Sequence, residues 1–201
     1  MIISMNAEIV CTDGHYGHLD SIILNPETAQ VTDLAILKDG LFTHTWLVPI
    51  AHIVDSTPSL IRLDMSVKEI ADEMIPFIRT EYLSPDVPDV VYTTDMVWPH
   101  LMADMEAKTI EHENVPHNER AVHRKAVVTA ENGMLGYLQD VIVDPQDWRI
   151  TQIGIRAGHW YGHARLMVPT SAIDHFGEDV ITLSISKEEV ETLTPSLESK
   201  G

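Results

Sequence analysis

Two histidines in a glycine-flanked stretch are the first residues whose type and spacing could do chemistry. His159 and His163 stand four residues apart in HWYGH. Imidazoles at this spacing can share a metal ion on one face of a helix, but a glycine-flanked hairpin tip does not fix the distance between them. Neither a third ligand nor a carboxylate that would orient the imidazoles is identifiable nearby in the sequence. We therefore predict no metal site and no metal cofactor in this stretch.

Aromatic residues give the best candidates for binding a partner. Trp160 and Tyr161 lie in the same stretch, where their rings either cover the end of the folded domain or form an exposed contact point for another protein. Trp98 lies in DMVWPHLMADMEA, where apolar residues recur at helical spacing. This pattern predicts a short docked helix, with a peptide or cofactor groove at Trp98 as the alternative. The candidate interaction residues are thus Trp98, His159, Trp160, Tyr161 and His163.

The sequence offers no motif for catalysis. It contains neither a Gly-x-Ser-x-Gly nucleophile motif nor a glycine-rich phosphate loop before a helix. The single cysteine, Cys11, excludes an intramolecular disulfide, and its apolar surroundings in the sequence favour a buried hydrophobic residue over a reactive thiol. We therefore predict that the protein is not an enzyme, and that it has no catalytic residues and no cofactor.

The charge of the chain argues against nucleic acid as a partner. There are 31 acidic and 13 basic residues, and the net charge of -18 repels the phosphate backbone that nucleic-acid binders neutralise. Residues 83–119 are the most acidic part per residue, which favours a solvated linker, with a docking surface for a basic partner as the alternative. Four histidines in and after this segment lack metal-site spacing, and their protonation could make association sensitive to pH between about 5 and 7. They are His100, His112, His117 and His123.

Membrane insertion is not expected. No stretch approaches the roughly 18 consecutive apolar residues of a spanning helix. The start, MIISMNAEIVCTDG, lacks the basic head and the long apolar run of a signal peptide. We therefore expect a soluble, cytoplasmic protein.

A phrase of ten residues occurs twice in similar form. GHLDSIILNP at residues 17–26 returns with its flanking pattern as GYLQDVIVDP at residues 136–145. Such a repeat marks a duplicated structural unit. Glycine allows tight turns and positive φ, and an Asx-Pro pair ends a strand. The predicted turn residues are Gly14, Gly17 and Pro26 in the first copy, and Gly133, Gly136 and Pro145 in the second.

Each copy predicts about six short strands and a terminal helix. The runs around the repeated phrase alternate apolar and polar residues, which predicts a three-stranded antiparallel meander. Capping boxes, SVKE from Ser66 and SKEE from Ser186, mark the helix starts. The apolar face of the first helix is expected to continue through Ile75 and Ile78. Short strands in this number favour a small antiparallel barrel, because closure removes sheet edges.

The order of these motifs resembles the PRC-barrel domain, found in the cytoplasmic part of the photosynthetic reaction-centre H subunit and in a ribosome-maturation factor. The matching motifs are Gly-x-x-Gly, the repeated phrase, VTxLxI, VPxxxI, IxL and SxxE. The second copy fits more closely, since the first has Ser21 where the second has Asp140, and its LFTHTWLVP lacks a compact glycine-rich tip. The resemblance implies a barrel used mainly as an interaction module, without catalytic residues.

These observations predict an all-β protein with short helices, built from two small antiparallel PRC-type barrels in tandem, each followed by a helix. We expect barrel one and its helix at residues 1–82, an acidic linker with a short helix at 83–119, and barrel two with its helix and tail at 120–201. The predicted function is a non-enzymatic scaffold or adaptor for a protein partner, in stress response or complex assembly by resemblance. The alternative is a small-molecule or metal sensor that uses the cleft between the barrels. A homodimer is left open, because small barrels can bury an open edge against a second copy.

Overall fold

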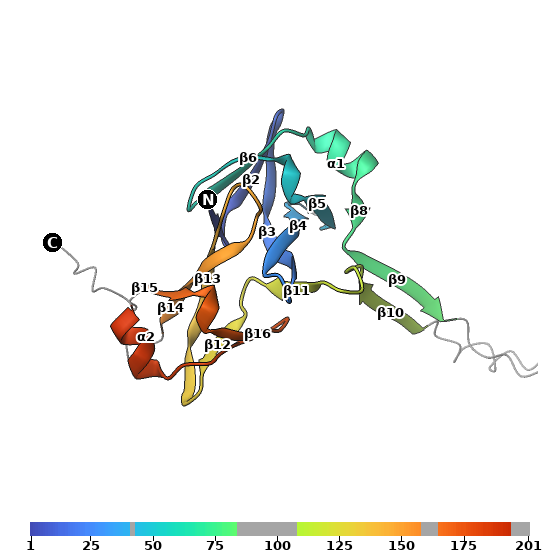
Figure 1. The fold of residues 1–201 in the computed structure, drawn as a ribbon. Coiled ribbons are helices and arrows are strands. Elements are labelled where there is room, and N and C mark those ends of the chain that lie inside the picture. The colour runs from blue at the N-terminus through green and yellow to red at the C-terminus, as the bar shows by residue number, and fades with distance from the viewer. Residues whose placement is uncertain (41–42, 84–107, 158–164, 194–201) are drawn as a thin grey trace, which may run out of the picture. The chain divides into compact units, whose positions relative to one another are not determined.

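The computed structural model describes residues 1–40, 43–83, 108–157 and 165–193 (Figure 1). These residues form mostly β-strands, with two short α-helices, α1 (Val67–Glu73) and α2 (Lys187–Leu193). The prediction of an all-β protein with short helices is therefore confirmed. Neither of these helices has the length and apolar character needed to cross a membrane.

The chain divides into two compact units, which differ from the segments expected from the sequence. One unit joins Met1–Phe77 to Val115–Gly201, and the other is Ile78–Asn114. The first unit thus contains both copies of the repeat. In the second, β9 (Ile78–Leu83) and β10 (Lys108–Glu113) form an antiparallel pair. The helix predicted around Trp98 lies outside the described residues.

Each copy of the repeat builds one sheet of the first unit. In the first copy the strands follow the order β6-β7-β2-β3-β4-β5-β8, and in the second copy the order is β15-β14-β13-β12-β17-β16. The first set is β2 (Glu8–Cys11), β3 (Gly14–Asn25), β4 (Gln30–Lys38), β5 (Thr45–Pro49), β6 (Ile53–Ser56), β7 (Leu60–Leu63) and β8 (Ile75–Pro76). The second set is β12 (Val127–Ala130), β13 (Gly133–Val143), β14 (Ile150–Ala157), β15 (Arg165–Pro169), β16 (Ile173–Phe176) and β17 (Val180–Leu183).

The meander predicted for each copy is confirmed. Strands β2, β3 and β4 pair antiparallel in sequence order, and β12, β13 and β14 do the same. A short 3₁₀ turn follows the Val-Pro pair in both copies, η1 (Ile50–His52) and η4 (Thr170–Ala172). The last strand of each copy then returns parallel to the first, as β7 with β2 and β17 with β12. Both sheets are curled (Figure 1).

The two copies exchange a strand with each other. Strand β1 (Ile2–Ser4) precedes the first copy but pairs with β13 of the second. Strand β11 (Arg120–His123) precedes the second copy but pairs with β3 of the first, and Figure 1 shows it beside the end of that strand. The two registers are equivalent when positions are shifted by the repeat distance, since Ser4 faces Asp140 and His123 faces Ser21. Each sheet is thus completed by the other half of the chain.

A second reciprocal contact joins the copies at the hairpins that follow the repeated phrase. The amide of Val31 donates to the carbonyl of Trp148 at 3.0 Å, and the amide of Ile150 donates to the carbonyl of Ala29 at 2.8 Å. Ala29 and Trp148 occupy equivalent positions in the repeat, and both have positive φ, at 53° and 59°. The copies are therefore related by an approximate two-fold arrangement within one chain.

One hydrophobic core serves both copies. It contains fully buried residues of the exchanged strands, of the first sheet and of the second, such as Ile3, Ile36, Val122 and Ile153. A smaller cluster lies where the chain leaves and re-enters this unit, because Phe77 packs with Ile23, Ala35, Leu47 and Ala121, and Val115 packs against the cluster. The shared core explains why the copies form one compact unit.

Helix α1 begins as predicted but ends earlier. Ser66 caps it, with the amide of Glu69 donating to the Ser66 hydroxyl and the Glu69 carboxylate accepting from the Ser66 amide. The predicted continuation of its apolar face through Ile75 and Ile78 is wrong. A proline disfavours helical backbone at the residue before it, which here is Ile75. Ile75 and Pro76 form β8 instead, which pairs with β5. Ile75 is accordingly 57% exposed.

The capping box of α2 is also present. The amide of Ser186 donates to the Glu189 carboxylate at 2.8 Å, and the Ser186 hydroxyl accepts from the Glu189 amide at 3.4 Å. The Ser186 amide and the Ser186 hydroxyl both donate to the Glu189 carboxylate, and these bonds lower the pKa of Glu189 below its ordinary value, as bonds from Ser66 do for Glu69. Both helices therefore begin with the same sequence-encoded hydrogen bonds.

Candidate binding hollow at the exchanged strands

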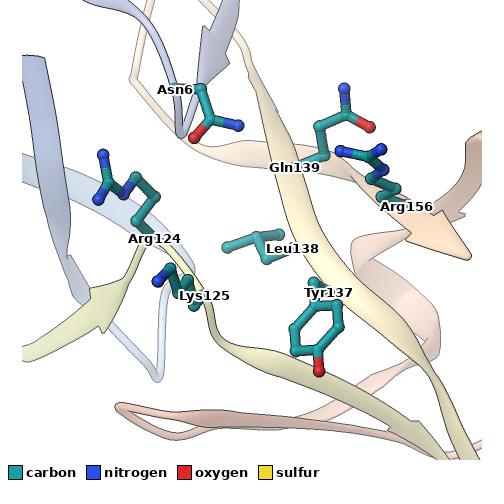
Figure 2. Close-up of a pocket in the computed structure, with 7 residues that line it drawn as sticks. All are labelled: Asn6, Arg124, Lys125, Tyr137, Leu138, Gln139 and Arg156. Carbon is teal, nitrogen blue, oxygen red and sulfur yellow. The ribbon is translucent and has the colours of Figure 1, made fainter. Parts of the chain in front are cut away.

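A hollow of about 320 Å³ lies beside the exchanged strands. Figure 2 shows the side chains that line it. They come from the turn after β1, the turn after β11, and the adjacent strands β13 and β14. The lining residues are Asn6, Arg124, Lys125, Tyr137, Leu138, Gln139 and Arg156.

Backbone hydrogen bonds position the two turns. The amide of Met5 donates to the carbonyl of Gln139 at 2.8 Å, which holds the neighbouring Asn6 against β13. The turn after β11 is closed by the amide of Ala126, which donates to the carbonyl of His123 at 3.0 Å. Ala126 also accepts from the amide of Leu138 at 2.8 Å. The strand exchange thus builds the hollow, because both turns are continuations of exchanged strands.

The charge of the hollow is opposite to that of the protein. Three of its lining residues are basic, Arg124, Lys125 and Arg156, and no acidic residue is among the described residues that line it. Within the described part of the chain these three side chains make no ion pair and no hydrogen bond. Asn6 and Gln139 add amide groups. The hollow is therefore rich in hydrogen-bond donors.

The equivalent position in the other copy lacks this character. Shifting the lining by the repeat distance puts Met5 in place of Arg124, Leu37 in place of Arg156 and Asp20 in place of Gln139. Two cations are lost and one anion is gained. The basic hollow thus belongs to one copy alone, although the backbone turn is common to both.

A row of side chains borders the hollow, and all of them are exposed except the half-buried Val127. Across the second sheet, Val180, Val127, Tyr137 and Arg156 face one another on neighbouring strands. Tyr137 is 49% exposed and Val180 is 43% exposed. Directly opposed residues share one face of a sheet, so these side chains form a continuous apolar and aromatic strip that ends at an arginine. Such a strip has the composition of a protein contact surface.

An ion pair between a buried aspartate and a partly exposed arginine lies further along β13. Nη2 of Arg165 is 2.7 Å from Oδ2 of Asp140, whose side chain is 3% exposed. The contact is an ion pair without the alignment of a hydrogen bond. Gly154 makes room for it, because a Cβ there would lie 3.1 Å from the same Asp140 oxygen. Ser21, Ala35 and Thr45 stand at the equivalent positions of the first copy, so the pair is another feature of the second copy.

The first copy has its own polar groups. Oγ of Ser21 lies 3.1 Å from Nδ1 of His123. This contact joins a residue of the repeated phrase to the exchanged strand β11. On the surface, Nδ1 of His18 is 3.0 Å from one Asp39 oxygen, and Nδ1 of His15 is 3.9 Å from the other. Among the described residues, no group of three or more His, Cys, Asp or Glu side chains is arranged to hold a metal.

The cysteine is buried, as its sequence context predicts. Cys11 is 4% exposed, and burial followed by the nearby Asp13 charge raises its pKa to about 11. Burial also raises the pKa of Tyr16 to about 12, with a further contribution from Cys11. The Tyr16 hydroxyl has no hydrogen-bond partner among the described residues. At neutral pH the thiol is therefore protonated and a poor nucleophile.

The predicted turn glycines occupy two kinds of position. Gly14 and Gly133 have φ values of 150° and 127°, which other residues rarely adopt. Gly17 and Gly136 instead lie against the neighbouring strand, where a Cβ would be 2.0 Å from the Leu37 carbonyl oxygen or 2.1 Å from that of Arg156.

The predicted turn prolines follow Asx residues whose side chains organise the turn. Before Pro26, the Asn25 side chain accepts from the amide of Glu27 at 2.9 Å. Before Pro145, the Asp144 side chain accepts from the amide of Gln146 at the same distance. These are the hydrogen bonds of Asx turns.

The interaction residues predicted from the sequence lie outside the described residues. They are Trp98, His159, Trp160, Tyr161 and His163. The residues of the hollow were not predicted, because Arg124-Lys125 and Arg156 lie in different elements and no local motif joins them. One signal was available, since residues 120–201 hold 8 of the 13 basic residues.

Comparison with protein-family models and curated sequences identifies no relative. No protein-family model matches the chain, and no curated protein resembles it in sequence. The resemblance to the PRC-barrel domain therefore rests on the motifs alone.

Proposed function

We propose that the protein is a non-enzymatic scaffold or adaptor of the cytoplasm, built from two PRC-type barrels that exchange strands. The exposed row that ends in Tyr137 and Arg156 is the observation that carries this proposal. Aromatic and arginine side chains in such strips supply much of the binding energy at protein interfaces. The order of the repeated motifs supports the barrel assignment, and the interaction role follows from it by resemblance.

Affinity purification of the tagged full-length chain, with mass spectrometry, tests this function. The test variant is Tyr137→Ala with Val180→Ser, which shortens the exposed row. The control is Val54→Ser, which removes an apolar side chain that is 60% exposed on β6. We expect a stoichiometric partner to be recovered with the wild type and the control and lost with the test variant. Equal recovery with all three, or a protein recovered alone, would contradict the proposal.

A second copy of the chain is one partner that this design can detect. Light scattering after size exclusion gives the mass of the purified protein. A mass of two chains for the wild type and one for the Tyr137→Ala, Val180→Ser variant would identify the partner as the protein itself. A single-chain mass for the wild type would assign the row to a different protein.

The alternative function is a small-molecule sensor. The observation that favours it is the hollow itself, whose volume of about 320 Å³ is within the range of small-ligand sites. A sensor should show a thermal shift with a small ligand in the absence of any protein partner, whereas an adaptor should retain its partner without that ligand. The two functions are therefore separable by experiment.

A further inference from the structure

We propose that the hollow binds an organic anion, in the form of a phosphate or carboxylate group carried on an apolar body. This inference goes beyond the proposed adaptor function, because it concerns the chemistry of the hollow, which shares only Tyr137 and Arg156 with the exposed row. It depends on three observations: the basic lining, the apolar floor, and the lack of charge compensation within the described residues.

The donors are suited to an oxyanion. Arg124 and Lys125 are consecutive residues of one turn, and Arg156 comes from β14. An arginine can donate two parallel hydrogen bonds to a phosphate or carboxylate, and a lysine adds a point charge. Asn6 and Gln139 can donate through their amide groups. An anion in the hollow would therefore meet donors from several elements.

The floor is suited to an apolar body. Figure 2 shows Leu138 between Arg124 and Lys125 on one side and Tyr137, Gln139 and Arg156 on the other. Leu138 is only 3% exposed, so it forms part of the floor of the hollow and not of its rim. A flat apolar group could cover Leu138 and contact the Tyr137 ring, while its anionic group reaches the cations.

Electrostatics makes this site selective at short range. A net charge of -18 repels anions at a distance, and that repulsion is screened over about 8 Å at physiological salt. Clustered cations without intramolecular partners would carry an unfavourable mutual repulsion, which a bound anion relieves. The equivalent positions of the first copy, which include Met5 in the turn and Asp20 on β3, have no such cluster. The hollow is thus the place in the described structure where an anion would replace repulsion with attraction.

Two kinds of molecule could carry such an anionic group on an apolar body. One is a free small molecule, and the other is a phosphorylated side chain of another protein. Phenyl phosphate represents the shared chemistry, and a short phosphotyrosine peptide represents the second source. Inorganic phosphate and phenol are the partial probes, since each lacks one half of the proposed ligand.

Titration calorimetry and amide chemical shifts of the full-length chain provide the test. The hollow variant is Arg124→Gln with Lys125→Gln, which changes a half-buried and an exposed side chain of one turn outside the exposed row and leaves the backbone contacts intact. The matched control is Arg62→Gln with Lys68→Gln, which alters the net charge equally at two exposed positions elsewhere. Near-ultraviolet circular dichroism confirms that each variant is folded.

We expect phenyl phosphate to bind the wild type and the control more tightly than either partial probe, with shifts at residues 137–139. In the hollow variant the affinity should fall by roughly tenfold or more, because charge-assisted hydrogen bonds are lost. Equal losses in the hollow variant and the control would show a nonspecific charge effect and overturn the proposal. So would unchanged binding in the hollow variant, or no binding of phenyl phosphate and of the peptide.

The peptide identifies the source. Tighter binding of the phosphotyrosine peptide than of phenyl phosphate, reduced by the hollow variant, would assign the ligand to a protein. Equal or weaker binding of the peptide would assign it to a free small molecule. The hollow variant leaves Tyr137, Arg156 and Val180 in place, so it should lose anion binding and still recover the partner in the affinity purification, and the two proposals fail separately.

Discussion

The glycines of the repeat differ in what they contribute. At Gly136 the neighbouring strand approaches so closely that a Cβ would overlap a backbone oxygen, which cannot move without breaking the sheet. At Gly14 nothing lies within 4 Å of such a Cβ, and only the positive φ disfavours replacing the glycine by another residue. One position is limited by space and the other by backbone conformation.

This difference predicts different costs for alanine. Gly136→Ala should lower the free energy of unfolding by about 3 kcal/mol or more, because the strands must separate. Gly14→Ala should cost about 1–2 kcal/mol from backbone strain alone. Urea unfolding followed by tryptophan fluorescence measures both. Equal losses would mean that the close approach at Gly136 relaxes without disturbing the sheet.

Substitutions of Asp140 and Arg165 should have coupled effects on stability, because the two side chains form an ion pair. Arg165→Met leaves a buried carboxylate without its cation and should lower the free energy of unfolding by about 2 kcal/mol. This value is smaller than for a fully buried pair, because the Arg165 side chain is 42% exposed. The double variant Asp140→Asn, Arg165→Met should cost less than the sum of the single changes. A double-mutant cycle in urea gives the coupling energy. Strict additivity would show that the pair contributes nothing to folding.

At the scale of the elements, much of the fold was predictable. The repeated phrase predicts both meanders because alternation and turn residues are local properties, and the capping boxes mark both helix starts. The end of α1 was missed because the edge of β5 competes for Ile75 and Pro76. The exchange was missed because β1 and β11 are only 3 and 4 residues long, and nothing in so short a strand specifies its partner. The hollow depends on that exchange, so it was missed with it.

The exchange of β1 predicts a long-range effect. Ile3→Ala removes a fully buried side chain and should cost about 2–4 kcal/mol. Hydrogen exchange should increase at residues 140–143 of β13, the pairing partner, more than in β2 and β3. Ile61→Ala on β7 is the control, and it should instead expose residues of its neighbour β2. An increase confined to the first copy after Ile3→Ala would contradict the pairing.

At the scale of the molecule, the two copies form one folding unit. Each sheet receives a strand from the other copy, and residues of both fill one core. A chain cut between the copies should therefore remain assembled, because the cut removes only a covalent connection and none of these contacts.

Cleavage at a specific protease site inserted between residues 90 and 100 provides the test. We expect the two fragments to elute together from a size-exclusion column in native buffer and to separate in concentrated urea. Uncut protein is the control for the elution volume. Separation in native buffer would mean that each copy folds independently and that the exchanged strands contribute little.

The approximate two-fold relation has a consequence for sequence variation. In a dimer of identical chains every substitution enters both symmetry-related positions, so a residue that suits one site must be tolerated at the other. Covalent joining of the copies removes this restriction. Arg124 can stand at one turn while Met5 stands at its equivalent, and Asp140 can keep a charge that Ser21 does not share. Two matching frameworks within one chain are thereby free to carry different chemistry.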